Sequence, residues 1–411
     1  MTTLNTWVPV PEKSDFSIYN LPFGIFSKNT EAPKAGIAIG EQIVDLALVS
    51  ELGLLDIDAG YFKKSTLNDF IALGKKITNK VRLDIQKLLV IENSPLKNHP
   101  EVFVLQKDAT MHLPVHVGDY TDFYSSIEHA TNVGKMFRNP ENALLPNWRH
   151  IPVGYHGRAS SIVVSGTEIR RPMGQVKTND MKAPVFQASD RLDFELEMGF
   201  VVGKSTELGE RVSTKNAAEY IFGLVLFNDW SARDIQKWEY VPLGPFLGKS
   251  FASSMSPWIV TLEALEPFKI QGPEQEPEVL SYLEYEGDRN YDIQLEVAMS
   301  TSTSEDTTIS KSNFKYMYWN MMQQLAHHTV NGCNINVGDV MASGTISGKD
   351  ESSYGSLLEI SWGGKKPFEL KDGSKRTFIE DNDTVTMRGF AEKEGKRVGF
   401  GEVTGTILPS K

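Results

Sequence analysis

From about Met111 to the C-terminus, short apolar runs alternate with turns that are rich in glycine and proline. Each run has the length of a β-strand, and such turns interrupt helices. The runs lie at 161–165, 194–202, 222–227, 258–260, 293–297 and 356–361. Only the stretches 231–238 and 314–328 show a convincing helical pattern. The pattern predicts a mainly β fold, a roll or sandwich with few helices, rather than a doubly wound α/β sheet.

The first part of the chain has a different texture. Two short strand patterns, 36–40 and 42–46, flank Glu41 as in a hairpin, and a helical stretch opens at 65–70. Few polar groups that could form a site occur here, which indicates a structural or regulatory role. A chain of 411 residues is long enough for two domains. We predict a small domain over 1–113 and a large β-rich domain over 114–411.

Charge and cysteine content limit the partners and the compartment. The formal net charge is −11, and an acidic surface repels phosphate, so nucleic acid is not an expected partner. The single cysteine, Cys333, cannot form an intrachain disulfide, which fits a reducing cytoplasm. The N-terminal residues 1–7 lack the basic and apolar regions of a signal peptide. Apolar runs such as 222–227 are far shorter than the roughly 20 residues that cross a bilayer, so no membrane contact is expected.

The segment 192–198, LDFELEM, alternates strictly between apolar and acidic residues. On a strand, residues two apart share a face, so Asp193, Glu195 and Glu197 lie on one face of this segment. Alternation alone is more typical of a solvated outer face. The four apolar side chains of the segment would then face the core.

The run 222–227 predicts a buried strand, and it ends at Asn228 and Asp229. Ser231 and Asp234 resemble a capping box that starts a helix, which places Asp229 at a strand end just ahead of that helix. Arg233, Gln236 and Tyr240 follow at spacings of three and four and share one stripe of it. These three side chains could also simply form a solvent-exposed face of the helix that bonds to water. A guanidinium, an amide and a phenol are also donors that suit an anionic or carbonyl substrate.

Two further residues stand in polar, glycine-containing contexts. Ser125 with Glu128 could cap a helix and place His129 in its first full turn. A lone histidine is more often a structural residue than a general base. The sequence around Lys249 nearly matches a phosphate-binding P-loop, but it has one residue too few between the glycines and carries Pro245. We therefore reject a nucleotide site and interpret Lys249 as a mobile cation in a glycine-rich turn.

Four carboxylates, Asp122, Glu195, Glu197 and Asp229, are the best candidates for a site made only of oxygen ligands. If they converge without a metal, their repulsion forces some of them to hold a proton. A hard dication removes that conflict, and all-oxygen ligation favours Ca²⁺, Mg²⁺ or Mn²⁺ over Zn²⁺. Spacing alone does not establish that the four residues meet.

Several motifs together resemble the fumarylacetoacetase family, also called the fumarylacetoacetate hydrolase family. They cover nearly the whole chain, from NLPFG at 20–24 to GSLLE at 355–359. Glu195-Leu-Glu197 and the NDWSARD segment at 228–234 belong to the wider superfamily. More specific are TDFYSS at 121–126, HATNVG at 129–134, PVGYHGR at 152–158, GKSF at 248–251 and SGTIS at 343–347.

The resemblance implies an SH3-like N-terminal barrel, a C-terminal β-roll and a homodimer. It implies that Asp122, Glu195, Glu197 and Asp229 hold a catalytic Ca²⁺ or Mg²⁺. A second, structural Mg²⁺ would lie near Asp229, Lys249 and Ser253, with Ser253 standing where family members can carry threonine. His129 would be the general base and Glu359 its orienting partner. The resemblance also assigns substrate contacts to Tyr124, Arg138, Tyr155, Gln236, Tyr240 and Thr345.

The implied reaction is hydrolysis of a carbon–carbon bond in a small diketo acid, 4-fumarylacetoacetate, at the end of tyrosine and phenylalanine breakdown. A metal that chelates the β-diketone lets the carbanion leave as an enolate. Arg233, Gln236 and Lys249 would stabilise the oxyanion. One alternative is a sister enzyme of the same fold, an acylpyruvate hydrolase, decarboxylase or hydratase. The other is a scaffold protein that keeps the fold without activity.

Overall fold

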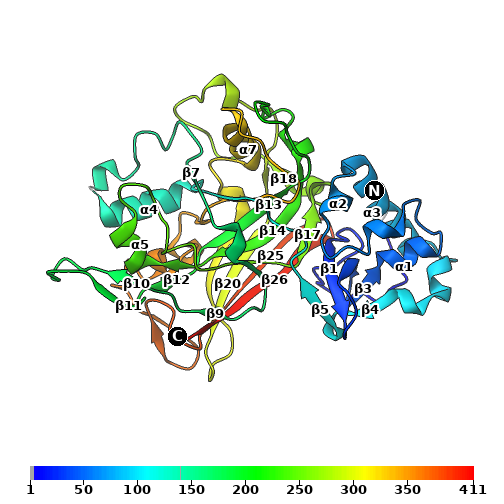
Figure 1. Ribbon diagram of the computed structural model, residues 1–411, viewed down its shortest axis with the longest axis horizontal. Helices are drawn as coiled ribbons and strands as arrows, with labels where there is room; N and C mark the ends of the chain where they lie inside the picture. The colour runs from blue at the N-terminus through cyan, green and yellow to red at the C-terminus, as the bar shows by residue number, and fades with distance from the viewer. Residues whose placement is uncertain (1–3, 139) are drawn as a thin grey trace.

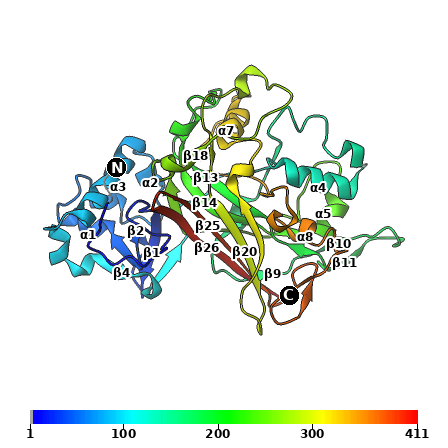
Figure 2. The same ribbon diagram turned by 180° about the vertical axis from the view of Figure 1, so that it is seen from behind.

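The computed structural model describes residues 4–138 and 140–411. Of the N-terminal segment 1–7, residues 1–3 lie outside the described part. The described chain is mainly β with few helices, as the sequence predicts. A smaller N-terminal unit lies beside a larger body that carries the C-terminus (Figure 1), and the view from behind shows the same arrangement (Figure 2).

The N-terminal unit combines short strands with helices. Its strands are β1 (Phe23–Lys28), β2 (Lys34–Ile39), β3 (Gln42–Asp45), β4 (Phe103–Leu105) and β5 (Ala109–His112). Its α-helices are α1 (Leu46–Glu51), α2 (Asn68–Ile71) and α3 (Lys75–Val90). The predicted hairpin is confirmed, because β2 and β3 pair with Ile39 opposite Gln42. No closed barrel is found among the described residues, so the SH3-like barrel stays a prediction.

The main sheet continues from the N-terminal unit into the larger body. Strand β1 pairs with β17, with Phe23 opposite Ile259. The strand order is β4-β3-β2-β1-β17-β14-β13-β22-β6-β7, and β16 also pairs with β14 and β8. The strands of the larger body in this sheet are β6 (Tyr120–Phe123), β7 (Gly154–His156), β8 (Ile162–Val164), β13 (Leu196–Val202), β14 (Ile221–Asp229), β16 (Ser253–Met255), β17 (Trp258–Thr261) and β22 (Val340–Ala342).

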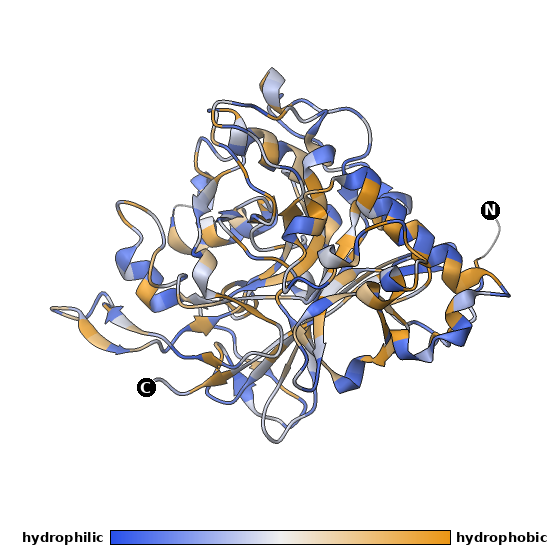
Figure 3. Cartoon of the chain, turned by 45° about the vertical axis from the view of Figure 1, so that its right-hand side comes forward, coloured by the Kyte–Doolittle hydropathy of each residue, from blue (hydrophilic) through white to orange (hydrophobic). Residues whose placement is uncertain are grey.

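A second sheet packs against the first through β26, which contacts β14 and β17. Its order is β21-β20-β25-β26-β9. The strands are β9 (Ile169–Arg170), β20 (Gln294–Ser300), β21 (Thr307–Asn313), β25 (Thr384–Lys393) and β26 (Lys396–Leu408). Leu226, Val297 and Met387 belong to one buried core between the sheets. The hydropathy view shows the strands of the interior largely apolar and many outer helical turns hydrophilic (Figure 3).

Strand β14 shows why the run 222–227 is almost continuously apolar. Leu224 and Leu226 pack into the core between the sheets, whereas Val225 and Phe227 pack into the core shared with the N-terminal unit. Both faces of β14 are therefore buried, as the sequence predicts for a strand without alternation.

Short pairs of strands and five α-helices complete the described part of the larger body. The pairs are β10 (Met173–Val176) with β11 (Val185–Ala188), β12 (Leu192–Asp193) with β15 (Ser231–Ala232), β18 (Lys269–Ile270) with β19 (Asn290–Tyr291), and β23 (Phe368–Glu369) with β24 (Lys375–Arg376). The helices are α4 (Ile127–Phe137), α5 (Arg233–Glu239), α6 (Leu262–Leu265), α7 (Met321–Thr329) and α8 (Leu357–Ile360). No helix in the described ranges has the length and apolar character needed to span a membrane.

Three helical details differ from the sequence predictions. The stretch 356–361 forms helix α8 instead of a strand, with Ser356 as its N-cap. Helix α7 begins at Met321, after the short 3-10 helix Phe314–Tyr316, so the predicted 314–328 helix starts later. Helix α5 begins at Arg233, because Ser231 is drawn into the two-residue strand β15 opposite Asp193.

Candidate metal centre and catalytic pair

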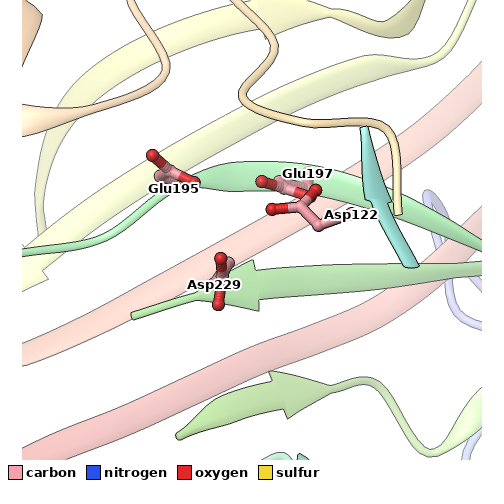
Figure 4. A group of neighbouring side chains, drawn as sticks. All are labelled: Asp122, Glu195, Glu197 and Asp229. Carbon is pink, nitrogen blue, oxygen red and sulfur yellow. The ribbon is translucent and has the colours of Figure 1, made fainter. Parts of the chain in front are cut away.

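The four predicted carboxylates meet. One oxygen atom from each of Asp122, Glu195, Glu197 and Asp229 lies within 4.8 Å of the others. Figure 4 shows the four side chains gathered together, with Asp229 at the end of its strand. All four residues are buried, which excludes the solvated outer face that alternation alone would favour.

The sheet order explains how residues so far apart in sequence converge. Strands β13 and β14 pair with Leu196 opposite Asn228, which brings Glu195 and Glu197 beside Asp229. Strand β22 pairs with β13 on one edge and with β6 on the other, with Ala342 opposite both Gly199 and Asp122. Asp122 thus joins the cluster through β22, a strand that itself contributes no carboxylate to it.

The electrostatics of the cluster are those of a cation site. Burial raises the pKa of Asp122 well above its usual range, and the neighbouring charge of Asp229 adds to the effect. Burial and the charge of Asp122 do the same to the pKa of Glu197. Among the described residues, Asp122 Oδ1 and Glu197 Oε1 are buried and accept no hydrogen bond. These free oxygens in an all-oxygen donor set fit a hard dication such as Ca²⁺ or Mg²⁺.

Lys249 is a fixed part of this cluster, and its interpretation as a mobile cation was wrong. Its side chain is 6% exposed, and Nζ lies 2.5 Å from Glu195 Oε2 and 2.7 Å from Asp229 Oδ2. Burial lowers the pKa of Lys249, but the charges of Asp229 and Glu195 outweigh it and raise that pKa. Burial likewise raises the pKa of Glu195, but Lys249 and Arg233 outweigh burial and lower it. Glu195 therefore keeps its negative charge in the cluster.

Two hydroxyl groups donate hydrogen bonds to the carboxylate of Asp229. Ser253 Oγ donates to Asp229 Oδ1 at 2.9 Å, and Tyr155 Oη donates to Asp229 Oδ2 at 2.9 Å. Ser253 lies directly opposite Asp229 in the pairing of β14 with β16. Both predicted residues thus lie at the site.

Of the predicted stripe Arg233, Gln236 and Tyr240 on α5, only part faces the carboxylate cluster. Arg233 Nη1 lies 2.8 Å from Glu195 Oε1, and it also lies 3.3 Å from Gln236 Oε1, to which it donates. Tyr240 is 50% exposed, at the C-terminal end of the helix. The predicted Ser231–Asp234 capping box is wrong. Ser231 Oγ instead donates to the carbonyl of Asp229, and the Asp234 carboxylate accepts from Ser189 Oγ.

His129 and Glu359 form a buried pair. His129 Nδ1 lies 2.6 Å from Glu359 Oε2, although the residues are 230 positions apart. Burial raises the pKa of Glu359, but His129 and further hydrogen bonds outweigh burial and lower it. An ionised carboxylate only accepts hydrogen bonds, so the proton lies on Nδ1 and Nε2 is the basic nitrogen.

The helix that carries His129 starts one residue later than predicted. Ser126, and not Ser125, is the N-cap of α4 and accepts a bond from the His129 amide at 3.3 Å. Ser125 Oγ instead accepts from Gln324 Nε2 at 2.8 Å. His129 still lies in the first turn, so the predicted placement holds through a different cap.

The other residues predicted to contact substrate, Tyr124, Thr345 and Arg138, make no hydrogen bond to the carboxylate cluster in the described ranges. The Tyr124 ring lies edge-on to His129 with centroids 5.3 Å apart. Thr345 Oγ1 is buried and makes no hydrogen bond within the described ranges. Arg138 is exposed, and its Nη2 donates to the carbonyl of Ala143 at 2.6 Å. A cavity of about 170 Å³ borders Tyr155, Asp229 and Lys249.

Comparison with known protein families decides the identity of the fold. Residues 120–408 match the family described as fumarylacetoacetate hydrolase C-terminal, and residues 19–114 match fumarylacetoacetase N-terminal. The chain belongs to the fumarylacetoacetate hydrolase family. The motif resemblance that the sequence indicates is thereby confirmed.

Two relatives in this family are similar to the chain over almost its full length. The fumarylacetoacetase of Homo sapiens is 52% identical over 98% of this chain and 99% of its own. That of Bos taurus is 53% identical with the same coverage. A solved fumarylacetoacetate hydrolase from psychrophilic Exiguobacterium antarcticum has a TM-score of 0.54 at 16% identity. It covers 95% of this chain and 99% of its own, and at that identity it shows the fold alone.

Sequence reasoning missed the residues that surround Glu359 in this family member. Asn132 Nδ2 donates to Glu359 Oε1, and Ser347 Oγ and Ser356 Oγ donate to Oε2, each at 2.9 Å. The Ser-x-x-Glu spacing of Ser356 and Glu359 was a readable helix-start signal. Asn132 and Ser347 lie inside the motifs at 129–134 and 343–347, but the motifs do not reveal that both residues bind Glu359, because Glu359 is distant along the chain from Asn132 and lies outside both motifs.

Proposed function

We propose that this protein hydrolyses a carbon–carbon bond of 4-fumarylacetoacetate, giving fumarate and acetoacetate as the last step of tyrosine and phenylalanine catabolism. The observation that carries the proposal is the buried carboxylate cluster together with the His129–Glu359 pair. Both lie in a chain that is 52% identical to a fumarylacetoacetase over nearly its full length. The substrate is a small anionic diketo acid, and an acidic protein needs local cations such as Arg233 and Lys249 to hold it.

The proposed cofactor is Ca²⁺ or Mg²⁺, held by Asp122, Glu195, Glu197 and Asp229. Such an ion, when bound, polarises the diketone and stabilises the enolate character of the leaving group. Support for this assignment comes from the two buried carboxylate oxygens that lack a hydrogen-bond partner in the described chain.

The protein's own groups are proposed to carry the proton and to stabilise the oxyanion. His129 Nε2 takes a proton from water, and the resulting hydroxide attacks the carbonyl next to the fumaryl group. Arg233, Gln236 and Lys249 donate to the tetrahedral oxyanion. When the intermediate collapses, the carbon–carbon bond breaks with its electron pair on the acetoacetate carbon. The leaving carbon must gain a proton, and the imidazolium of His129 can return the one it took.

Substrate contacts are proposed for Tyr124, Arg138, Tyr155, Gln236, Tyr240 and Thr345. Thr345 Oγ1 is buried without a hydrogen-bond partner in the described ranges, so it is free to bind a ligand. A second, structural Mg²⁺ is proposed beside Asp229 and Ser253. A protonated lysine has no lone pair, so the ammonium of Lys249 can only neighbour that ion.

We further propose a cytoplasmic homodimer with a domain boundary at 113/114. An SH3-like N-terminal domain and a C-terminal β-roll would be its two domains. Support for self-association comes from apolar side chains around the end of α5: Leu243 is 97% exposed, Val241 67% and Phe246 66%. Exposed apolar patches of this kind mark interaction surfaces. Light scattering of the wild type and of Leu243→Lys measures whether this patch holds two copies together.

The alternative is an acylpyruvate hydrolase or decarboxylase of the same superfamily. Turnover of fumarylacetoacetate, followed as loss of its ultraviolet absorbance, is to be compared with turnover of an acylpyruvate. We expect preference for fumarylacetoacetate and loss of activity with chelator. Asp229→Ala and Glu195→Ala should lose both metal binding and turnover. Asp339→Asn changes a buried carboxylate outside the cluster and serves as the control. Full turnover in metal-stripped enzyme would contradict the metal role.

A further inference from the structure

Asp193 lies between the two halves of the site, although it belongs to neither the carboxylate cluster nor the His129–Glu359 pair. Its carboxylate is fully buried. It binds the guanidinium of Arg233 on one side and the first turn of α8 on the other. We propose that Asp193 is a positioning residue that holds Arg233 and α8, the helix carrying Glu359, in one fixed arrangement. This inference rests on the proposed function, because it gives Asp193 a part in that reaction.

The backbone places Asp193 between the segments that lead into these two helices. On one edge, Asp193 lies opposite Ser231 in the pairing of β12 with β15, just before α5 begins. On the other edge, Glu195 forms a bridge with Ser356, and the amide of Leu196 donates to the carbonyl of Gly355 at 2.9 Å. One extended stretch therefore fixes where both helices begin.

Helix α8 depends on Asp193 for its first amide groups. The first N–H groups of a helix have no partner within it. The amide of Leu357 donates to Asp193 Oδ1 at 2.7 Å, and the amide of Leu358 donates to Oδ2 at 3.0 Å. Glu359 follows in the same turn, so any shift of α8 changes the 2.6 Å contact between Glu359 Oε2 and His129 Nδ1.

Arg233 depends on Asp193 for the orientation of its guanidinium plane. Nε donates to Asp193 Oδ2 at 2.8 Å, while Nη1 lies 2.8 Å from Glu195 Oε1. Contacts to two different nitrogens fix the plane of a guanidinium group, whereas a single contact leaves the group free to rotate. Nη2 is buried and makes no hydrogen bond within the described chain. It is the donor that remains for an anionic group of the substrate.

The informative substitution is Asp193→Asn, which keeps the volume but removes the charge and one acceptor. The new amide would present N–H groups to other donors. The matched control is Asp234→Asn, at the start of α5. The Asp234 carboxylate is also buried and accepts from Ser189 Oγ at 2.6 Å and from the Asp190 amide at 2.8 Å. No hydrogen bond of its side chain within the described ranges reaches the guanidinium of Arg233 or α8.

The first measurement is steady-state kinetics with saturating dication, below the unfolding temperature of both variants. Loss of a charge-assisted contact predicts a fall in kcat of at least about tenfold for Asp193→Asn, with KM changed less than about threefold. Asp234→Asn should keep kcat within about twofold of the wild type. An unchanged kcat in Asp193→Asn, or an equal loss in the control, overturns the proposal.

The second measurement does not depend on turnover. The protein has 8 histidines, and ¹⁵N-histidine labelling makes the proton on His129 Nδ1 observable as a downfield resonance. His129→Ala assigns this resonance. We expect it to shift or broaden in Asp193→Asn and to stay in place in Asp234→Asn. An unchanged resonance in Asp193→Asn overturns the proposal. If the wild type does not cleave fumarylacetoacetate, the proposed function fails, and this resonance still tests Asp193.

A second variant covers the case in which Asp193→Asn does not fold. Asp193→Ser removes the charge and is too short to reach Arg233, but it leaves a small polar side chain in place of the carboxylate. It should lose kcat in the same way as Asp193→Asn. If both variants fail to fold while Asp234→Asn folds, Asp193 is a structural residue and the proposal is overturned.

Discussion

At the scale of single residues, the carboxylates of the site differ in their partners. Some are paired with a cation of the protein, and others have an unpaired oxygen that a bound metal ion would neutralise. Glu195 has two cations within 2.8 Å, whereas Asp122 Oδ1 and Glu197 Oε1 have no partner in the described structure. The sequence marks Glu195 and Glu197 by strand alternation and Asp229 by a strand end, whereas Asp122 lies in the polar motif TDFYSS at 121–126. The sequence could not predict that they meet, because Asp122 reaches the others only through its neighbour β22.

Removing the imidazole of His129 should slow the reaction without disturbing the metal. The expected loss in kcat for His129→Ala is about 10²–10⁴-fold, because the metal and the oxyanion donors still act. Glu359→Gln should lose less, since the imidazole remains but is less well oriented. His112→Ala, which removes a histidine bound to Ser27 in the N-terminal unit, is the control. A near-normal kcat in His129→Ala would place the base elsewhere.

Substitutions of two arginines should affect different kinetic constants, one mainly kcat and the other mainly KM. Arg233 is buried against Glu195, so Arg233→Ala should mainly lower kcat by more than about tenfold, as for a lost charge-assisted hydrogen bond. Arg138 is exposed, so Arg138→Ala should mainly raise KM if it holds a substrate carboxylate. Arg149→Ala, whose guanidinium binds the carbonyl of Glu276, is the control in the same assay. Unchanged kinetics in either variant would remove that arginine from the site.

At the scale of secondary structure, the sequence predicted strands better than helix starts. The apolar runs at 194–202 and 222–227 contain β13 and most of β14, because burial of apolar surface dominates both. The helix starts depended on competing partners. Ser125 and Ser126 are both good caps, and distant partners decide between them: Ser125 bonds to Gln324 in α7, and Ser126 bonds to Ser347. Ser231 lost its predicted cap because Asp193 pairs with it across the sheet.

The capping box of α7 should be worth a measurable share of stability. Asn320 accepts from the amides of Met322 and Gln323, and the Gln323 side chain returns a bond to the Asn320 backbone. Asn320→Ala should therefore lower the free energy of unfolding by about 1 kcal/mol, seen as a lower melting temperature. Asn216→Ala is the matched control, because Asn216 starts a 3-10 helix without a side-chain cap bond. Equal melting temperatures for both variants would show that the box contributes nothing.

At the scale of the whole molecule, the N-terminal unit and the site share one sheet. Strand β1 pairs with β17, β17 pairs with β14, and β14 ends at Asp229. The core on the N-terminal side of β14 also contains Phe23, Phe70 and Phe222, whose rings pack against one another. The N-terminal unit therefore stabilises the strand that carries a metal ligand. Neither spacing nor composition predicts this, because it follows from a pairing between residues 23 and 259.

Metal and pH should affect the stability of the whole fold together. In the metal-free chain, burial and like charges raise the pKa of Asp122 and Glu197 above their ordinary values of 3.8 and 4.5. A carboxyl group whose folded pKa is raised holds its proton in the folded state after the unfolded chain has lost it. Its contribution to stability is complete below those ordinary values and is lost as pH rises through the folded pKa.

The metal-stripped protein should therefore lose stability as pH rises above about 4–5, and added Ca²⁺ or Mg²⁺ should restore more of it at the upper end of that window. The measurement is the melting temperature from pH 5 to 8, with chelator and with each dication. Glu197→Gln puts a neutral amide in place of a carboxyl group whose pKa is raised. In chelator, its melting temperature should depend less on pH than that of the wild type. Added dication should raise its melting temperature less. Equal stabilisation by dication at every pH, or an unchanged slope in Glu197→Gln, would contradict a cluster that needs the ion to remain ionised.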